Sequence, residues 1–434
     1  MGDGRSPEGV FSLKTVVLIL FVALYAFMIA KPKYRTWAAL AAAVIVCALG
    51  VVPLRELPDA IDFNVLMMIG GTMIVVDYFI ESGMPGLLAE ALLKRSHNAR
   101  AVVIYMSLFA GVVSAFIDNV ATVLMIAPVG LAICKKLRIN PVGMLLAIAV
   151  SSNLQGAATL VGDTTSIMLG AYAGMDFMSF FWVEGKPGIF WAVELGAAAT
   201  VPVLMLLFRD MKQPVDAEVS TKVDSIFPSV MLSGIVLTLI AASFLPNRPA
   251  LTNGIICCAY ALVSMLWDLL RSRSHTGLVR SLRSVDLQTI LLLTGLFVVI
   301  RALENVGLID EIAEMIARLG GGKLFPLYTA IVWLSVAISA FVDNIPYVAT
   351  MLPVVQGVAA SMGIEPYLLY FGLLSGATLG GNLTPVGASA NITATSILRR
   401  EGCEVSIRDF ARIGVPLTLT AVTVGYVFLW VFWK

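Results

Sequence analysis

Much of this chain consists of apolar stretches long enough to cross a lipid bilayer. A membrane-spanning helix needs about 20 mostly apolar residues. Such stretches cover residues 14–30, 36–53, 63–80, 142–175, 188–208, 227–245, 250–270, 289–305, 366–398 and 408–433. Only 13% of the residues are charged, against about 25% in soluble domains. Because so few charges cannot cover a soluble protein of 434 residues, the sequence predicts an all-α polytopic membrane protein.

Two of these apolar stretches are too long for one straight helix. Residues 142–175 and 366–398 each contain a polar, glycine-rich centre. We therefore expect each stretch to be a helix that is broken near its middle.

Two further apolar stretches carry an Asp-Asn pair at their centres. The pair is Asp118-Asn119 in residues 100–135 and Asp343-Asn344 in residues 325–361. About 36 residues can enter the membrane halfway and return, which would place each pair at the tip of a re-entrant hairpin. Irregular backbone is tolerated at that depth only where protein or a water-filled cavity covers it.

The two halves of the chain are related by a shift of 225 residues. Residues 114–167 align without a gap on 339–392, with 16 identities in 54 positions. The matches include Asp118 with Asp343, Asn119 with Asn344, Pro128 with Pro353, Thr159 with Thr384, and Gly162 with Gly387. Because chance similarity between apolar segments does not align Asp, Asn, Pro and Gly in one register, the sequence predicts a duplication.

The repeat predicts the domain organisation. If the hairpins do not cross, each half has five crossings, and an odd number gives the halves opposite orientations, as in many secondary transporters. The first inverted repeat is 1–208, with helices within 14–80, hairpin 100–135, broken helix 142–175 and helix 188–208. A linker at 209–226 follows. The second repeat is 227–434, with helices within 227–305, hairpin 325–361, broken helix 366–398 and helix 408–433. Amphipathic segments at 85–95 and 309–319 precede the hairpins.

The distribution of basic residues predicts the orientation. With ten crossings, 20 Lys and Arg residues fall on one side and 8 on the other, and one falls within a span. The side richer in Lys and Arg is normally cytoplasmic. We therefore expect both termini, and the entrance of the second hairpin, on the extracytoplasmic side, in a bacterial inner membrane.

Polar side chains at membrane depth are functional candidates, since placing them there is costly. At the hairpin tips they are Asp118, Asn119, Thr122, Asp343 and Asn344. In the first broken helix they are Ser151, Ser152, Asn153, Thr159, Gly162, Asp163, Thr164 and Thr165. In the second they are Thr378, Asn382, Thr384, Gly387, Ser389 and Asn391. Half-helices that end or begin here leave carbonyls for cations and N–H groups for anions.

These residues predict a site for a substrate and a coupling ion, either Na⁺ or H⁺. Asp118, Asp343 and Asp163 supply the carboxylates; Asp163 is matched by Ala388 in the second repeat. In the alternative interpretation, the two tip Asp residues are helix N-caps and the Asn residues only satisfy backbone groups in turns.

Other classes of function lack their sequence motifs. The chain has no GxxxxGK[ST] nucleotide-binding loop, no His/Glu metal cluster and no nucleophile elbow. We expect neither enzyme activity nor a cofactor, no metal beyond Na⁺ at the hairpin tips, and no nucleic-acid partner.

Two strings resemble a known family. Residues 116–128 (FIDNVATVLMIAP) and 376–391 (GATLGGNLTPVGASAN) resemble the ion transporter superfamily, in particular its arsenite permease and melanosomal P protein branch with a citrate transporter-like domain. The resemblance implies a homodimer. It also implies an elevator mechanism, in which the helices within 14–80 and 227–305 form a fixed scaffold and the remaining helices form a sliding transport domain.

The hairpin tips depart from the pattern of the related dicarboxylate carriers. The Ser-Asn-Thr of those carriers corresponds here to Asp118-Asn119-Val120 and Asp343-Asn344-Ile345. Two added carboxylates repel a dianion unless they are protonated or hold cations. The sequence therefore favours a secondary active transporter coupled to H⁺ or Na⁺, either of the arsenite or antimonite efflux type or a cation/proton antiporter. A Na⁺-coupled dicarboxylate or citrate symporter and an ion channel of the same fold remain alternatives.

Overall fold

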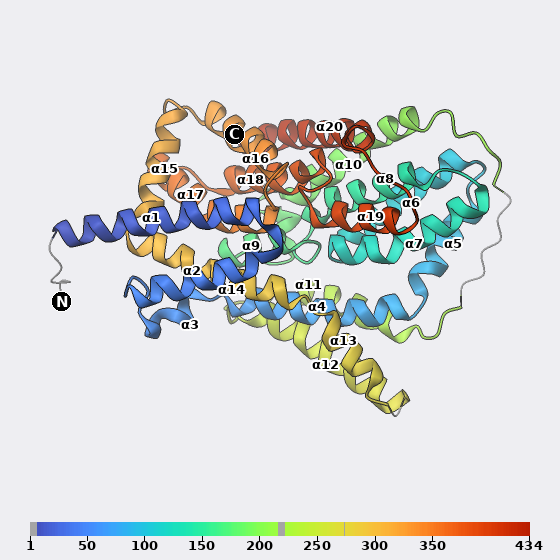
Figure 1. Cartoon of the computed structure of the whole chain (residues 1–434), viewed down its shortest axis with the longest axis horizontal. Coiled ribbons are helices and arrows are strands. Elements are labelled where there is room, and N and C mark those ends of the chain that lie inside the picture. The colour runs from blue at the N-terminus through green and yellow to red at the C-terminus, as the bar shows by residue number, and fades with distance from the viewer. Residues whose placement is uncertain (1–6, 216–221, 273) are drawn as a thin grey trace.

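The protein is an integral, multi-pass membrane protein built from helices (Figure 1). The computed structural model describes residues 7–215, 222–272 and 274–434. Within these ranges, nine helices are long and apolar enough to cross a membrane, and only two short strands pair. The predicted all-α polytopic class is confirmed.

Each half opens with three long helices. In the first half they are α1 (Pro7–Ala30), α2 (Arg35–Ala48) and α4 (Phe63–Glu81), with the short elements η1 (Pro32–Tyr34), η2 (Leu54–Glu56) and α3 (Leu57–Ala60) between them. In the second half they are α11 (Phe227–Ser243), α12 (Thr252–Ser272) and α14 (Leu287–Asn305). We call these six long helices the opening helices.

The opening helices of the two halves pack against each other, α4 against α12 and α2 against α14. Small residues permit this close approach. A Cβ atom added at Gly71 would lie 2.6 Å from the backbone carbonyl carbon of Cys257, and one added at Gly295 would lie 2.7 Å from that of Ala39. The opening helices of the two halves are therefore closely packed into one layer, which we call a wall.

The rest of each half contains the same elements in the same order. In the first half they are α5 (Met84–Lys94), α6 (Ala99–Ser114), α7 (Asn119–Leu137), α8 (Pro141–Gln155), η3 (Gly156–Ala158), α9 (Thr164–Tyr172) and α10 (Ile189–Leu207). In the second half they are α15 (Leu308–Leu319), α16 (Leu324–Ser339), α17 (Asn344–Met362), α18 (Tyr367–Gly380), η5 (Gly381–Leu383), α19 (Ser389–Arg400) and α20 (Ile407–Trp433). In Figure 1, α5 and α15 lie at opposite ends of the longest axis.

Three details differ from the sequence-based predictions. The helix predicted at 36–53 ends earlier, at Ala48, because the chain turns at Gly50, whose φ of 68° is left-handed. An amphipathic helix, α13 (Thr276–Ser284), was not predicted between α12 and α14. The loop before α10 contains η4 (Met178–Phe180) and the paired strands β1 (Trp182–Val183) and β2 (Lys186–Pro187).

Hydrogen bonds at the helix breaks recur in both halves. The Thr159 hydroxyl donates to the carbonyl oxygen of Ala115 at the first hairpin tip, and the Thr384 hydroxyl donates to that of Ala340 at the second. The carbonyl of Gly156, at the first break, accepts from Ser166 at 3.4 Å, and the carbonyl of Gly381 accepts from Asn391 at 3.2 Å.

Two glycines allow each hairpin tip to pack directly on its helix break. A Cβ atom added at Gly162 would lie 2.7 Å from the carbonyl oxygens of both Ser114 and Ala115. A Cβ atom added at Gly387 would lie 2.7 Å from that of Ser339 and 2.8 Å from that of Ala340. Backbone meets backbone at both positions, so each tip and its break form one packed unit.

We expect Gly162→Ala and Gly387→Ala to destabilise the protein by about 1–3 kcal/mol each, because the added methyl group meets backbone that cannot yield locally. The measurement is the melting temperature of the purified protein in detergent. Gly70→Ala is the control, since its Cβ atom would meet only Ile290, at an ordinary 3.8 Å. Equal melting temperatures for all three variants would contradict the packing described here.

Candidate functional site

The two broken helices meet at the centre of the molecule through Asn153. Its Nδ2 donates to the carbonyl oxygen of Thr378 at 2.8 Å, and its Oδ1 accepts from Nδ2 of Asn119 at 2.8 Å. Asn153 and Thr378 are 225 residues apart and are therefore repeat counterparts. The contact therefore joins equivalent positions of the two aligned segments.

Further hydrogen bonds surround this point, and two of them join the two halves. Asn382 donates from Nδ2 to the carbonyl oxygen of Val150 at 3.2 Å, and its Oδ1 accepts from Asn391 at 3.1 Å. The hydroxyls of Thr165 and Thr378 lie 3.0 Å apart. These side chains are fully buried, so the network replaces the hydrogen bonds that the broken helices lack.

Asp163 is the buried carboxylate of the first break. Its Oδ2 accepts from the Thr165 hydroxyl at 2.6 Å and from Nδ2 of Asn344 at 3.5 Å. Asn344 is the first residue of α17 at the second hairpin tip. The two halves therefore share this carboxylate, whereas the counterpart position, Ala388, offers no such group.

The tip residues Asp118 and Asp343 are both helix N-caps. Asp118 accepts from the backbone N–H groups of Val120 at 3.0 Å and Ala121 at 3.2 Å, and Asp343 accepts from that of Ile345 at 3.1 Å. The capping interpretation was therefore right for both residues. Capping leaves the second carboxylate oxygen of each Asp available for another partner.

A cavity of about 280 Å³ opens between the hairpin tips and the opening helices; we call it the tip cavity. Six of the predicted site residues line it: Asp118, Asn119, Asp163, Thr164, Asn344 and Ser389. The opening helices and the residues that precede them contribute Thr72, Asp77, Asp286 and Thr289.

The ionisable groups in the described lining of the tip cavity are all acidic. Its described lining contains four carboxylates, from Asp77, Asp118, Asp163 and Asp286, and neither Lys nor Arg. Asp77 forms an ion pair with Arg280 at 3.2 Å. The other three carboxylates have no ion-pair partner in the part of the chain that the structure describes.

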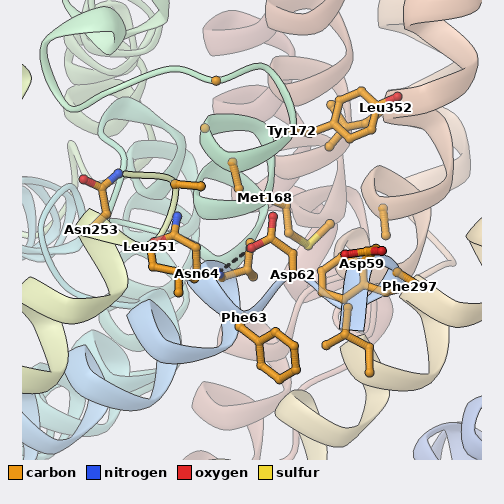
Figure 2. A pocket seen from close by; sticks show the side chains of 18 of the residues that line it. Asp59, Asp62, Phe63, Asn64, Met168, Tyr172, Leu251, Asn253, Phe297 and Leu352 are labelled. Atoms are coloured by element: carbon orange, nitrogen blue, oxygen red, sulfur yellow. Dashed lines mark hydrogen bonds between the residues drawn. The ribbon is translucent and has the colours of Figure 1, made fainter. Parts of the chain in front are cut away.

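A second cavity has a volume of about 730 Å³; we call it the distal cavity (Figure 2). Asp59, Asp62, Asn64, Met168 and Tyr172 are among its lining residues.

The same four helices line both cavities. Helix α4 contributes Phe63–Val65 to the distal cavity and residues between Thr72 and Ile80 to the tip cavity. Helices α9, α14 and α17 likewise contribute residues near their N-termini to the tip cavity and residues further along to the distal cavity. The cavities are therefore the two ends of one seam, with the opening helices α4 and α14 on one side and α9 and α17 on the other.

The other predicted site residues lie behind the tip cavity. Asn153, Thr378, Asn382 and Asn391 belong to the buried network, and Thr159, Gly162, Thr384 and Gly387 hold the tips on the breaks. Thr122 is turned back to the carbonyl oxygen of Ile117, at 3.4 Å, and does not line the cavity.

Sequence reasoning missed two charged residues near this site. Asp286 caps α14 through the N–H groups of Gln288 and Thr289, and an Asp just before an apolar stretch is a recognisable N-cap signal. Arg35 forms an ion pair with Asp343. No local signal identifies Arg35, because the contact joins residues far apart in the sequence.

Comparison with known proteins identifies the family. A model of the citrate transporter family matches residues 25–376. The chain belongs to the citrate transporter family. It is 33% identical to uncharacterized transporters of Mycobacterium bovis and Mycobacterium tuberculosis, over 96% of this chain and 98% of theirs.

Two further similarities agree with the superfamily that the sequence predicted. The chain is 26% identical to the human P protein, over 96% of its own length and 59% of the P protein. Its fold is similar to the crystal structure of the Alcanivorax borkumensis YdaH transporter, with a TM-score of 0.59, 16% identity and 97% of each chain covered. The predicted membership of the ion transporter superfamily is confirmed, and this chain is similar to transporters throughout its length.

We expect Asn153→Ala to destabilise this family member by about 1–3 kcal/mol, because the Thr378 carbonyl and the Asn119 amide would both lose their partner in a buried place. Ser375→Ala is the matched control. Ser375 is buried in α18, and its hydroxyl has no hydrogen-bond partner among the described residues, so its removal should leave the melting temperature unchanged or raise it. If both variants melted at the wild-type temperature, the bridge at Asn153 would contribute nothing.

Proposed function

We propose that this chain is a secondary active transporter for a small neutral or cationic solute, of the arsenite or antimonite type or an exchanged cation, driven by a H⁺ or Na⁺ gradient. The observation that supports this proposal is the composition of the tip cavity. Three carboxylates without an ion-pair partner and two amides line it, and its described lining has no basic side chain.

The charge of the tip cavity disfavours a free dianion. Two like charges 4 Å apart repel by about 4 kcal/mol at an effective dielectric constant of 20, and a dicarboxylate would meet several carboxylates at once. A cation would be attracted instead, and a neutral trihydroxide such as arsenious acid could hydrogen-bond to carboxylate, hydroxyl and amide groups.

The seam between the cavities supports a route across the membrane. Alternating access requires that a central site open to one side at a time. We propose that the opening helices form the scaffold of a homodimer, and that the hairpins, the broken helices and α10 and α20 slide along them as an elevator. Ser284 and Asp286 line the tip cavity close to the basic residues of α13, so under the positive-inside rule this cavity faces the cytoplasm.

In this proposal Asp118 and Asp163 are the coupling groups that bind the driving ion. Asp163 contacts both repeats through Thr165 and Asn344, so an ion bound there would act on the first helix break and on the second hairpin tip. Asp118 lies on the same cavity and uses only one of its carboxylate oxygens for capping.

Solute flux into proteoliposomes tests this proposal. Labelled arsenite, Na⁺ and citrate would each be measured with imposed pH and Na⁺ gradients. We expect arsenite or cation flux to follow one of the gradients, and Asp118→Asn and Asp163→Asn each to reduce the driven flux by about tenfold or more, since each removes a charge from the binding site. Asp210→Asn is the control, because Asp210 lies on the exposed surface.

Two results would contradict the proposal. Na⁺-driven citrate flux, with no arsenite or cation flux, would indicate the symporter alternative. Conductance far above carrier turnover, without coupling to either gradient, would indicate a channel.

A further inference from the structure

The two tip carboxylates occupy equivalent positions but have different partners. Oδ2 of Asp343 contacts Nη1 of Arg35 and also accepts from the Ser389 hydroxyl at 3.4 Å. Its Oδ1 accepts from the backbone N–H of Ile345. Asp118, its repeat counterpart, accepts only from backbone N–H groups of α7 among the described residues. One carboxylate is therefore fully occupied, and the other is open to the tip cavity.

The Arg35–Asp343 ion pair joins the two walls of the seam. Arg35 is the first residue of α2, one of the opening helices, whereas Asp343 caps α17 at the tip of the second hairpin. The two side chains are largely but not fully covered, with 25% and 16% of their surfaces exposed. Movement of α17 along the opening helices would separate the pair.

The surroundings of the pair are otherwise acidic. The charge of Asp286, in front of α14, also acts on Arg35, and the charge of Asp343 acts on Asp163, in front of α9. Arg35 is thus the cation that this conformation places at the second tip. A monovalent cation or a proton at Asp343 would have to take the position of the guanidinium group.

We propose that Arg35 is a built-in counter-cation that occupies the Asp343 carboxylate in this conformation and competes there with the driving ion of transport. This inference rests on the proposed function. When α17 moves away from α2, Asp343, Asn344 and Ser389 become free to bind the ion, as Asp118, Asn119 and Thr164 are at the first tip. Entry of the ion at Asp343 is therefore linked to the position of the moving wall.

The test is the concentration of driving ion that gives half-maximal substrate flux in proteoliposomes. Arg35→Ala should lower the half-maximal Na⁺ concentration by about tenfold, within the 5- to 150-fold range typical of coupled sites. If the proton is the driving ion, the proton concentration that gives half-maximal flux should likewise fall by about tenfold, because the guanidinium group no longer competes for the carboxylate. Arg35→Lys, which keeps the charge, should stay closer to the wild type.

Three further variants separate competition from a structural role. Lys33→Ala, at an exposed position two residues earlier, should leave the ion dependence unchanged. In an Asp343→Asn background, Arg35→Ala should have no further effect on it. Arg35→Gln, which retains a hydrogen-bonding side chain without the charge, should reproduce the shift if Arg35→Ala does not fold.

The possible failures can be told apart. If the wild-type protein shows no flux driven by either ion, the proposed function is wrong. If wild-type flux is driven but Arg35→Ala and Arg35→Gln keep the wild-type ion dependence, only the role of Arg35 is wrong. The same conclusion follows if the shift is equally large in the Asp343→Asn background.

Discussion

Every backbone group released by a helix break must find another partner, because neither lipid nor a dry protein interior supplies one. Polar side chains at matching positions meet this demand here. The Thr159 and Thr384 hydroxyls bond the hairpin carbonyls, and Asn153 bonds a carbonyl in the last turn of α18. The polar residues of the breaks therefore have a structural role: they satisfy backbone groups at the breaks. The same hydrogen bonds hold the residues of the candidate site close together.

The duplicated fold carries an asymmetric site. Both tips have the same cap and the same packed glycine, yet Asp163 faces the second tip with no equivalent carboxylate at Ala388. Arg35 adds a second difference, because it pairs with Asp343 and leaves Asp118 open to the tip cavity. A symmetric arrangement would present the same groups at both tips, whereas these differences give the two tips different partners.

Local patterns in the sequence predicted the all-helical class. They also identified polar residues of the two Asp-Asn stretches and of the two helix breaks that gather in the structure. Asp118, Asn119, Asp163, Thr164, Asn344 and Ser389 do line one cavity. A break in an apolar stretch and an Asp-Asn pair can each be recognised from a few neighbouring residues in the sequence. The contact between Arg35 and Asp343, 308 residues apart, has no local signature. Thr122 points away from the cavity because its side-chain rotamer in α7 directs the hydroxyl to the carbonyl oxygen of Ile117. These features arise from the packing of whole helices and could not be read from a single sequence.

The contact between Asn153 and Thr378 also bears on how the protein arose. At an axis of true two-fold symmetry, two identical subunits would present the same residue twice. The hydroxyl pair of Thr165 and Thr378 has Ala390 and Asn153 as its mirror image, and that combination cannot form the same bond. The network at the centre therefore requires two different sequences facing each other. It requires that the two copies have diverged, so two identical halves could not form it.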